Sequence, residues 1–147
     1  MPAGRTFIDT NIIIYAYDAS SGSKHERARE ILMELWNSGD GVLSTQVLQE
    51  LFVCLTGKIA KPMGARQARE IISDLLKWDV VVNDGNSILN AIEIHLKYRY
   101  SFWDSMIISS AIRANATNLL SEDLSHGQRI QWLKILNPFL DETKGLI

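Results

Sequence analysis

Four carboxylates are the residues of this chain whose types and spacing could do chemistry, and Asp9 is the first of them. It interrupts the apolar run Phe7-Ile8-Asp9-Thr10-Asn11-Ile12-Ile13-Ile14-Tyr15. An unpaired charge inside a buried strand would cost several kcal/mol, so Asp9 needs a physical reason. A strand that ends at Ile8 would leave Asp9 at the carboxyl edge of a sheet, where open α/β folds bind ligands. The alternative is that Asp9 only caps a following helix.

Asp123 and Glu50 are expected at the same edge. The segment Leu119-Leu120-Ser121-Glu122-Asp123 repeats the opening pattern, because an apolar strand runs into a hydroxyl residue and then into carboxylates. Glu50 lies within the first two turns of a helix that follows a strand. Such a helix begins at the carboxyl edge of the sheet, which predicts that Glu50 lies near Asp9 and Asp123.

Asp104 is the fourth carboxylate, and its position is harder to derive. Asp104, Ile107, Ile108 and Ala111 follow i, i+3, i+4, i+7 spacing, which aligns Asp104 with a buried helical stripe. A helix that precedes a strand should begin at the opposite edge, unless the helix before it reverses the chain. Two helical patterns intervene here, so we expect Asp104 to return to the edge that carries Asp9. Stabilisation of the helix N-terminus is the alternative role.

Converging carboxylates determine the chemistry that we expect. Like charges held close together are unfavourable without cations. Hard oxygen ligands, with no sulfur and no suitably placed histidine, fit Mg²⁺ or Mn²⁺. Such a site can activate water and neutralise the charge that develops on a phosphodiester, which is nuclease chemistry.

The elements that must position these residues alternate along the chain. Short β-like segments are expected at residues 6–8, 41–44, 80–82, 118–121 and 133–136. Apolar stripes predict helices around residues 28–36, 47–55, 68–76, 86–98 and 102–114. This alternation predicts a mainly parallel sheet with helices on both faces. The tail, residues 141–147, is expected to fray.

Bulk properties are those of one ordinary globular domain that spans residues 1–147. The chain is 46% hydrophobic and 22% charged, with a net charge of −2. This charge is not typical of a nucleic-acid-binding protein, so a polyanionic substrate would need a local basic patch or a bound metal. Cys54 is the single cysteine, which excludes a disulfide framework within the chain, and we interpret it as an inert core thiol. Without a signal-peptide pattern or a bilayer-length apolar run, we expect a cytoplasmic protein with no membrane partner.

The motifs together resemble the PIN-domain family, and within it the compact ribonuclease toxins of VapC type. The matching motifs are Phe7-Ile8-Asp9-Thr10-Asn11, Ser44-Thr45 followed by Gln49-Glu50-Leu51, Tyr100-Ser101-Phe102-Trp103-Asp104, and Leu120-Ser121-Glu122-Asp123-Leu124. They cover nearly the whole chain in the family's order. The resemblance implies an α/β three-layer sandwich whose mainly parallel central sheet has four to five strands.

The resemblance also implies a function. The chain would be a Mg²⁺- or Mn²⁺-dependent endoribonuclease in which Asp9, Glu50, Asp104 and Asp123 are both catalytic and metal-binding. Asn11 and Ser121 would support the site by hydrogen bonding. Toxins of this type form homodimers and are silenced by an antitoxin protein that fills the site.

Three other functions compete with this one. A phosphatase of the haloacid dehalogenase type needs a second aspartate two residues after the first, and Asn11 stands there. A receiver domain needs an acidic residue after the third strand, where Asn83 stands. The third alternative is a PIN scaffold that only binds RNA or a protein, which a titration with divalent cations would distinguish from an enzyme.

The remaining polar and aromatic residues divide into a few groups. Four cations without an intervening acid surround Pro62 and Gly64, and they favour RNA contact and a plain solvated connection about equally: Lys58, Lys61, Arg66 and Arg69. His25, His95 and His126 are not spaced as metal ligands. Trp36, Trp78 and Trp132 fit a core or an interface, and Trp103 fits a wall of the site better than a base-stacking platform. Asp18, Asp40, Asp84 and Glu122 stand near turns, where capping and solvent explain them.

Overall fold

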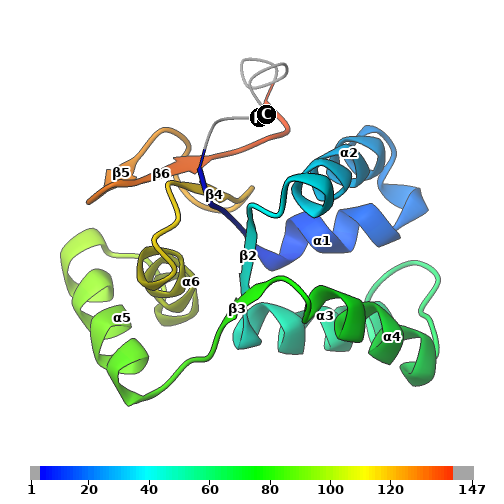
Figure 1. The fold of residues 1–147 in the computed structure, drawn as a ribbon, viewed down its shortest axis with the longest axis horizontal. Helices are drawn as coiled ribbons and strands as arrows, with labels where there is room; N and C mark the ends of the chain where they lie inside the picture. The colour runs from blue at the N-terminus through cyan, green and yellow to red at the C-terminus, as the bar shows by residue number, and fades with distance from the viewer. Residues whose placement is uncertain (1–3, 141–147) are drawn as a thin grey trace.

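The fold is built on a six-stranded sheet within residues 4–140, the part of the chain that the computed structural model describes. The strand order is β3-β2-β1-β4-β6-β5 (Figure 1). The strands are β1 (Thr6–Ile8), β2 (Gly41–Ser44), β3 (Asp79–Val81), β4 (Asn118–Leu120), β5 (Arg129–Ile130) and β6 (Leu133–Leu136). All neighbouring strands are parallel except β5, which pairs antiparallel with β6. The mainly parallel sheet is therefore confirmed.

The sheet has six strands, whereas four to five were expected, and β5 is the strand that the sequence did not predict. β5 has only two residues, too few for a period-two pattern to appear in the sequence. β3 also begins at Asp79, one residue earlier than expected.

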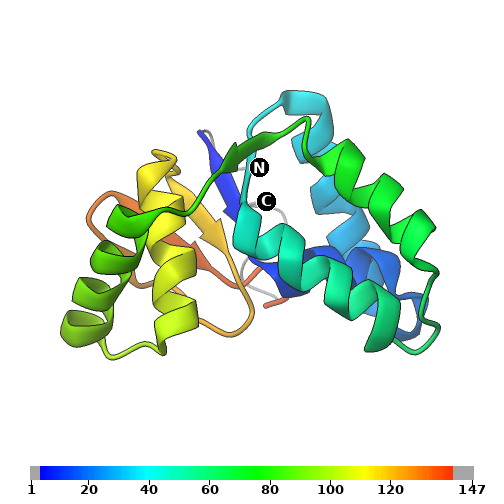
Figure 2. The same ribbon diagram turned by 90° about the horizontal axis from the view of Figure 1, so that it is seen from below.

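Helices cover both faces of the sheet. They are α1 (Thr10–Tyr17), α2 (Ser23–Ser38), α3 (Thr45–Gly57), α4 (Ala65–Leu75), α5 (Gly85–Tyr98) and α6 (Phe102–Arg113), with a short 3₁₀ turn, η1 (Ala19–Ser21). Figure 2 shows α5 and α6 on one side of the strands and α1 to α4 on the other. This is the expected three-layer α/β arrangement.

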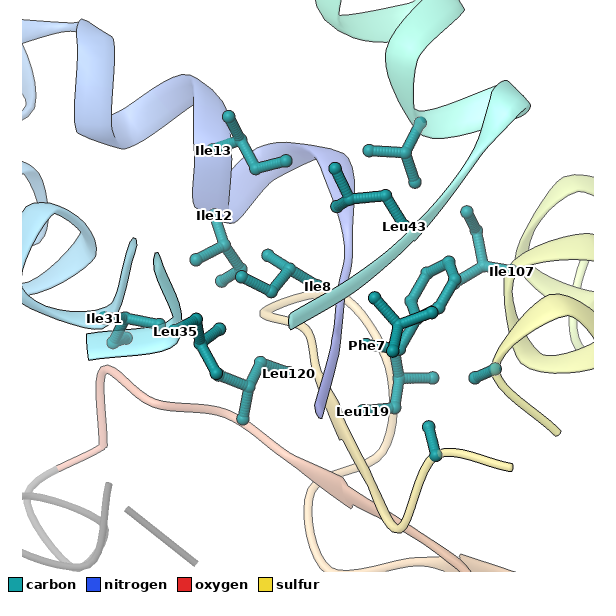
Figure 3. Close-up of a cluster of buried hydrophobic side chains, with 14 of the residues drawn as sticks. Phe7, Ile8, Ile12, Ile13, Ile31, Leu35, Leu43, Ile107, Leu119 and Leu120 are labelled. Carbon is teal, nitrogen blue, oxygen red and sulfur yellow. The ribbon is translucent and has the colours of Figure 1, made fainter. Parts of the chain in front are cut away.

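The core lies on both faces of β1 and β4. Successive residues of a strand point to opposite faces, and Figure 3 shows Phe7 and Leu119 directed toward Ile107 of α6 while Ile8 and Leu120 lie toward α1 and α2. Phe7, Ile8, Leu119 and Leu120 are fully buried. A strand buried on both faces reads as a continuous apolar run, as the sequence around β1 and β4 does.

The helix α1 was not among the predicted stripes. It begins at Thr10, immediately after β1, and its N-cap is Asp9. The isoleucine run that follows Asp9 is therefore helical. The short link forces the chain to turn at the carboxyl edge of the sheet, which holds Asp9 there.

The helix α5 buries the opposite side to its apolar stripe. Its buried residues are Ser87 and Ala91, and Ile94 packs partly buried against the core. The four side chains of the predicted apolar stripe are instead 38–67% exposed: Ile88, Leu89, Ile92 and Leu96. Packing against the small residues of α5 lets the helix approach α6 closely. The apolar stripe of α5 consequently faces away from the domain.

Three smaller expectations have different outcomes. Within residues 4–140 no helix is both long and apolar enough to cross a membrane. The tail at residues 141–147, expected to fray, lies outside the described residues. Cys54, interpreted as a core thiol, is a free cysteine that is only partly buried.

Candidate active site

Three adjacent strands end at one edge of the sheet and carry polar residues there. β1 pairs with β2 on one side and with β4 on the other, so their carboxyl ends lie side by side. Asp9 follows β1, Ser121 follows β4, and β2 leads directly into α3 at Thr45. The edge predicted from sequence is therefore assembled as expected.

Asp9 is the most buried carboxylate of this edge, with 8% of its surface exposed. Its Oδ1 accepts a 2.7 Å hydrogen bond from the Thr10 backbone N–H, and its Oδ2 accepts one of 2.8 Å from Ser121 Oγ. Burial raises the pKa of Asp9 to about 6; these two hydrogen bonds oppose the rise, and the negative charges of Glu50 and Asp104 add to it. Asp9 thus caps α1 and also lies in a field of other carboxylates.

Glu50 is exposed on α3 and is held from two sides. Gln46, one turn earlier on the same helix, donates from Nε2 to Glu50 Oε1 at 2.8 Å. Thr10 Oγ1 donates to Glu50 Oε2 at 3.4 Å. The residue after Asp9 therefore links α1 to the carboxylate of α3.

Asp104 does lie near this edge, as the reversal of the chain through α5 and α6 predicted. The negative charge of Asp104 helps to raise the pKa of Asp9. Gln46 Nε2, which binds Glu50, also donates to the carbonyl of Trp103, the residue before Asp104, at 3.3 Å. The N-cap of α6 is Ser101, whose Oγ accepts a 3.1 Å bond from the Asp104 N–H. Asp104 is therefore not the N-cap, although its carboxylate lies in the first turn of α6, where the helix dipole favours a negative charge.

Asp123 lies at the exposed side of the edge. Asn11 Nδ2 donates to Asp123 Oδ2 at 2.5 Å, and the Asp123 N–H donates to Ser121 Oγ at 3.3 Å. Ser121 therefore contacts two of the carboxylate residues, because its hydroxyl donates to Asp9 and accepts from the Asp123 backbone. The structure places Asn11 and Ser121 where supporting residues were expected.

Asp9 is close enough to Glu50 and Asp104 to interact with them electrostatically, but the four carboxylates are not clustered as ligands of one ion. Within the described residues, no group of three or more His, Cys, Asp or Glu side chains stands ready to hold a metal. The donors are nevertheless carboxylate oxygens, and the buried one has a raised pKa, so a hard cation fits this donor set electrostatically. A cation would have to draw these side chains together.

Sequence reasoning missed the partners of Glu122. Tyr15 Oη donates to Glu122 Oε1 at 2.6 Å, and Lys24 forms an ion pair with the same carboxylate. Burial raises the pKa of Glu122, but the bonds from Lys24 and Tyr15 outweigh it and leave the pKa below its usual range. Glu122 therefore fastens the segment that carries Ser121 and Asp123 to α1 and α2. The sequence held no sign of this, because the partners are about a hundred residues apart.

Gln46 was also missed, although a signal existed. Gln46 and Glu50 are spaced i, i+4 on a predicted helix, which places their side chains next to each other. The capping interpretation fits other polar residues: Asp84 caps α5 and Asp18 caps η1.

Each of the three histidines makes a local contact, as expected for packing residues. His25 Nδ1 lies 2.8 Å from the Tyr15 carbonyl oxygen, and His95 Nδ1 lies 2.5 Å from that of Tyr100. His126 Nδ1 accepts from the Asn137 N–H at 3.0 Å.

The basic stretch lies apart from the carboxylates. Arg66 and Arg69 line a groove beside Phe52. Phe52 and Glu50 are two positions apart on α3, so they point about 200° away from each other. The α3 helix therefore separates these arginines from Glu50, and Lys58 and Lys61 follow at its far end.

Trp103, expected as a wall of the site, has 65% of its surface exposed. Trp36 and Trp132 are also about half exposed, and the Trp36 and Trp78 rings pack at 5.9 Å between centroids. Trp78 is partly buried and packs against the hydrophobic core, so it alone fits the expected core role.

Solved structures share this fold. A toxin–antitoxin complex from Klebsiella pneumoniae matches with a TM-score of 0.68 and 17% identity over 91% of this chain and 98% of that one. VapBC2 from Rickettsia felis, bound to a promoter DNA fragment, gives 0.62 and 21% over 88% and 96%. VapC20 from Mycobacterium tuberculosis, a toxin that cleaves the sarcin-ricin loop, gives 0.59 and 18% over 78% and 86%.

Sequence comparison supplies the family. Curated protein sequences contain no match to this chain. The family model of the PIN domain, however, matches residues 6–128, from the first residue of β1 to the segment before β5. The match includes all four carboxylates of the sheet edge, and the chain belongs to the PIN-domain family.

Proposed function

We propose that this chain is a metal-dependent endoribonuclease that hydrolyses phosphodiester bonds in RNA and acts as the toxin of a toxin–antitoxin pair. The observation that carries the proposal is Asp9, a buried carboxylate with a raised pKa among the charges of Glu50 and Asp104. Folding a carboxylate into this position destabilises the free protein, and a divalent cation would offset that cost.

The proposed ligands are Asp9, Glu50, Asp104 and Asp123. A bound Mg²⁺ or Mn²⁺ would lower the pKa of a water molecule and neutralise negative charge on the phosphate. All four side chains supply oxygen, which is the ligand type that these ions prefer.

The surrounding residues of the chain orient these carboxylates. Ser121 and the Thr10 N–H bind both oxygens of Asp9, which fixes the plane of its carboxylate. Asn11 holds Asp123, and Gln46 holds Glu50. Positioned side chains lose less freedom when a cation binds, so these contacts favour one arrangement of the site.

An antitoxin partner is supported by the solved structures of similar fold, because one is a toxin–antitoxin complex and two are VapBC proteins bound to DNA. We place the activity in the cytoplasm, in line with the expectation from the sequence. RNA contact by Lys58, Lys61, Arg66 and Arg69 would require the RNA to extend past α3, since that helix separates them from Glu50.

A homodimer is supported by the apolar stripe of α5. Four large side chains of this helix face away from its own domain: Ile88, Leu89, Ile92 and Leu96. A contiguous exposed apolar patch is typical of a protein interface. A second copy of the chain would bury this stripe.

The test is cleavage of a labelled single-stranded RNA with Mg²⁺, with Mn²⁺ and with EDTA. We expect cleavage by the parent with either ion, none in EDTA, and none by Asp9→Asn. Glu34→Gln, which neutralises an exposed acid on α2, is the matched control and should cleave like the parent. Binding without cleavage under all conditions would instead favour a PIN scaffold that only binds RNA.

A further inference from the structure

The indole of Trp103 is the largest exposed group next to the carboxylates. Trp103 precedes Asp104 in the first turn of α6 and is 65% exposed. Exposure alone does not mark a site, because Trp132 is 48% exposed as well. Trp103 differs from Trp132 because it stands directly beside Asp104, one of the four carboxylates.

A buried amide ties the backbone of Trp103 to Glu50. Gln46 is 6% exposed, and its Nε2 donates both to Glu50 Oε1 at 2.8 Å and to the Trp103 carbonyl at 3.3 Å. The same side chain therefore sets the positions of a carboxylate on α3 and of the aromatic residue on α6.

Helix geometry gives the direction of the indole. At 100° per residue, Trp103 lies within about 40° of Ile107 and about 120° from Ser109. Ile107 faces the sheet beside Phe7 (Figure 3), whereas Ser109 Oγ reaches the Ser87 carbonyl of α5. Trp103 thus lies one turn before the sheet-facing Ile107 and on a different face of α6 from Ser109, and its own ring contact is with Phe102 of the same helix.

Phe102 restrains the ring without covering it. The two ring centroids are 5.1 Å apart and the planes meet at 75°, an edge-to-face contact. The Trp103 indole is therefore restrained on one side and open to a ligand over most of its surface.

The chemistry of a neutral aromatic suits this place. A cation beside Asp104 and Glu50 would pair with those carboxylates, whereas an indole can hold RNA without altering their charge. Unpaired bases stack on aromatic side chains, with about 1–3 kcal/mol per base and little dependence on sequence.

We infer that Trp103 is a stacking platform for an unpaired nucleobase of single-stranded RNA, next to the phosphate that the carboxylates act on. This inference rests on the proposed function. It makes Trp103 a substrate-binding residue and assigns to α6 both a carboxylate and a base-binding surface.

The first experiment measures RNA affinity in the Asp9→Asn background with Mg²⁺, by fluorescence anisotropy of a labelled single-stranded oligonucleotide. Trp103→Ala should weaken binding about 5- to 100-fold, and Trp103→Phe should restore most of it. Trp132→Ala is the control, because Trp132 lies in the β5–β6 turn at the opposite edge of the sheet. In the parent background, Trp103→Ala should raise KM more than it lowers kcat.

The second experiment scans one abasic nucleotide along the oligonucleotide. At one position of the oligonucleotide, the abasic nucleotide should weaken binding to the protein that has Trp103 and leave binding to Trp103→Ala unchanged. An abasic effect of equal size in both proteins, or an unchanged affinity of Trp103→Ala, overturns the inference. So does a change in oligomeric state on Trp103→Ala, measured by light scattering, because the indole would then be a protein contact.

The outcomes also separate the two proposals. A parent that cleaves RNA while Trp103→Ala matches it in affinity and KM overturns this inference alone. A parent that neither binds nor cleaves single-stranded RNA overturns the proposed function and this inference with it.

Discussion

Ser121 Oγ donates a 2.8 Å hydrogen bond to Asp9 Oδ2 across 112 residues of sequence, and it joins the ends of the two central strands β1 and β4. The Ser121 hydroxyl can reach the Asp9 carboxylate only if the last residues of β1 and β4 are paired with each other. The pairing of Ile8 with Leu120 provides that register. The bond therefore couples the order of the sheet to the orientation of the most buried acid.

The first prediction concerns the pH dependence of stability in EDTA. The pKa of Asp9 is raised to about 6 in the folded protein, against an ordinary value of 3.8. Between these two pKa values the folded state keeps a proton on Asp9 that the unfolded state has released. The contribution of this proton to the free energy of unfolding is therefore fully present below pH 4 and is lost as pH rises through 6. The difference corresponds to about 3 kcal/mol.

Asp9→Asn isolates this effect, because all other titrating groups are shared. The side-chain amide that this substitution introduces can still accept from the Thr10 N–H, and the Ser121 hydroxyl can turn to accept from it. Urea unfolding at pH 5 and pH 8 should show a smaller loss of free energy of unfolding for Asp9→Asn than for the parent. Equal losses would mean that Asp9 titrates normally.

The second prediction is that Ser121→Ala destabilises the protein by about 1–3 kcal/mol at pH 8, because a buried carboxylate loses a hydrogen bond. The loss should shrink at pH 5, where Asp9 is largely protonated and the bond to the charged form matters less. Parallel urea titrations of Ser121→Ala and Ser125→Ala, an exposed serine of the same loop, give the measurement and its control. If Ser121→Ala lowers the free energy of unfolding equally at both pH values, the loss is due to packing alone and not to the bond with charged Asp9.

The contrast between these residues and Asp104 shows what the sequence could predict. Asp9 and Ser121 were predictable because each interrupts or ends an apolar strand, and parallel strands end at one edge. The place of Asp104 depends on how α5 and α6 lie on the sheet, a tertiary property that helical periodicity does not contain. In the structure, Asp104 is placed near the edge by the bond of Gln46 to the Trp103 carbonyl and by the effect of its charge on Asp9.

Other features could not be predicted for related reasons. The stripe of α5 identifies a helix, but periodicity alone does not say which face is buried when small residues occupy the other face. The contact of Glu122 with Lys24 and Tyr15 joins segments about a hundred residues apart, so it requires the fold. β5 is too short for any pattern.

The third prediction concerns two glycines. A Cβ on Gly41 would overlap the ring of Trp78, whereas a Cβ on Gly57, the last residue of α3, would meet no atom within 4 Å. Gly41→Ala should therefore lower the free energy of unfolding by about 1–3 kcal/mol. Gly57→Ala should raise it by about 0.5–1 kcal/mol. Chemical unfolding of both variants checks the opposite signs, and a neutral Gly41→Ala would show that Trp78 moves freely.

The fourth prediction concerns the basic stretch. If Arg66 and Arg69 each contact an RNA phosphate, replacing both with Ala should reduce the slope of log K against log salt by about 1.4 for single-stranded RNA. The loss of affinity should be similar for different sequences, because phosphate contacts do not read bases. Anisotropy titrations at several salt concentrations give the slope, with Lys77→Ala, just past the far end of α4, as the control. An unchanged slope would assign these arginines to solvent or to a protein partner.

The last prediction separates the charge of Asp104 from the cap of α6. Because Ser101 is the N-cap, Asp104→Asn should change the melting temperature little in EDTA, yet it should weaken Mn²⁺ binding and abolish RNA cleavage. Ser101→Ala should do the reverse: it should lower stability by about 1 kcal/mol through loss of the cap while Mn²⁺ still binds. Calorimetric titration with Mn²⁺ and thermal melts of both variants test the pair. If Asp104→Asn binds Mn²⁺ as tightly as the parent, the ion is held by the remaining three carboxylates, and Asp104 contributes only its field at Asp9.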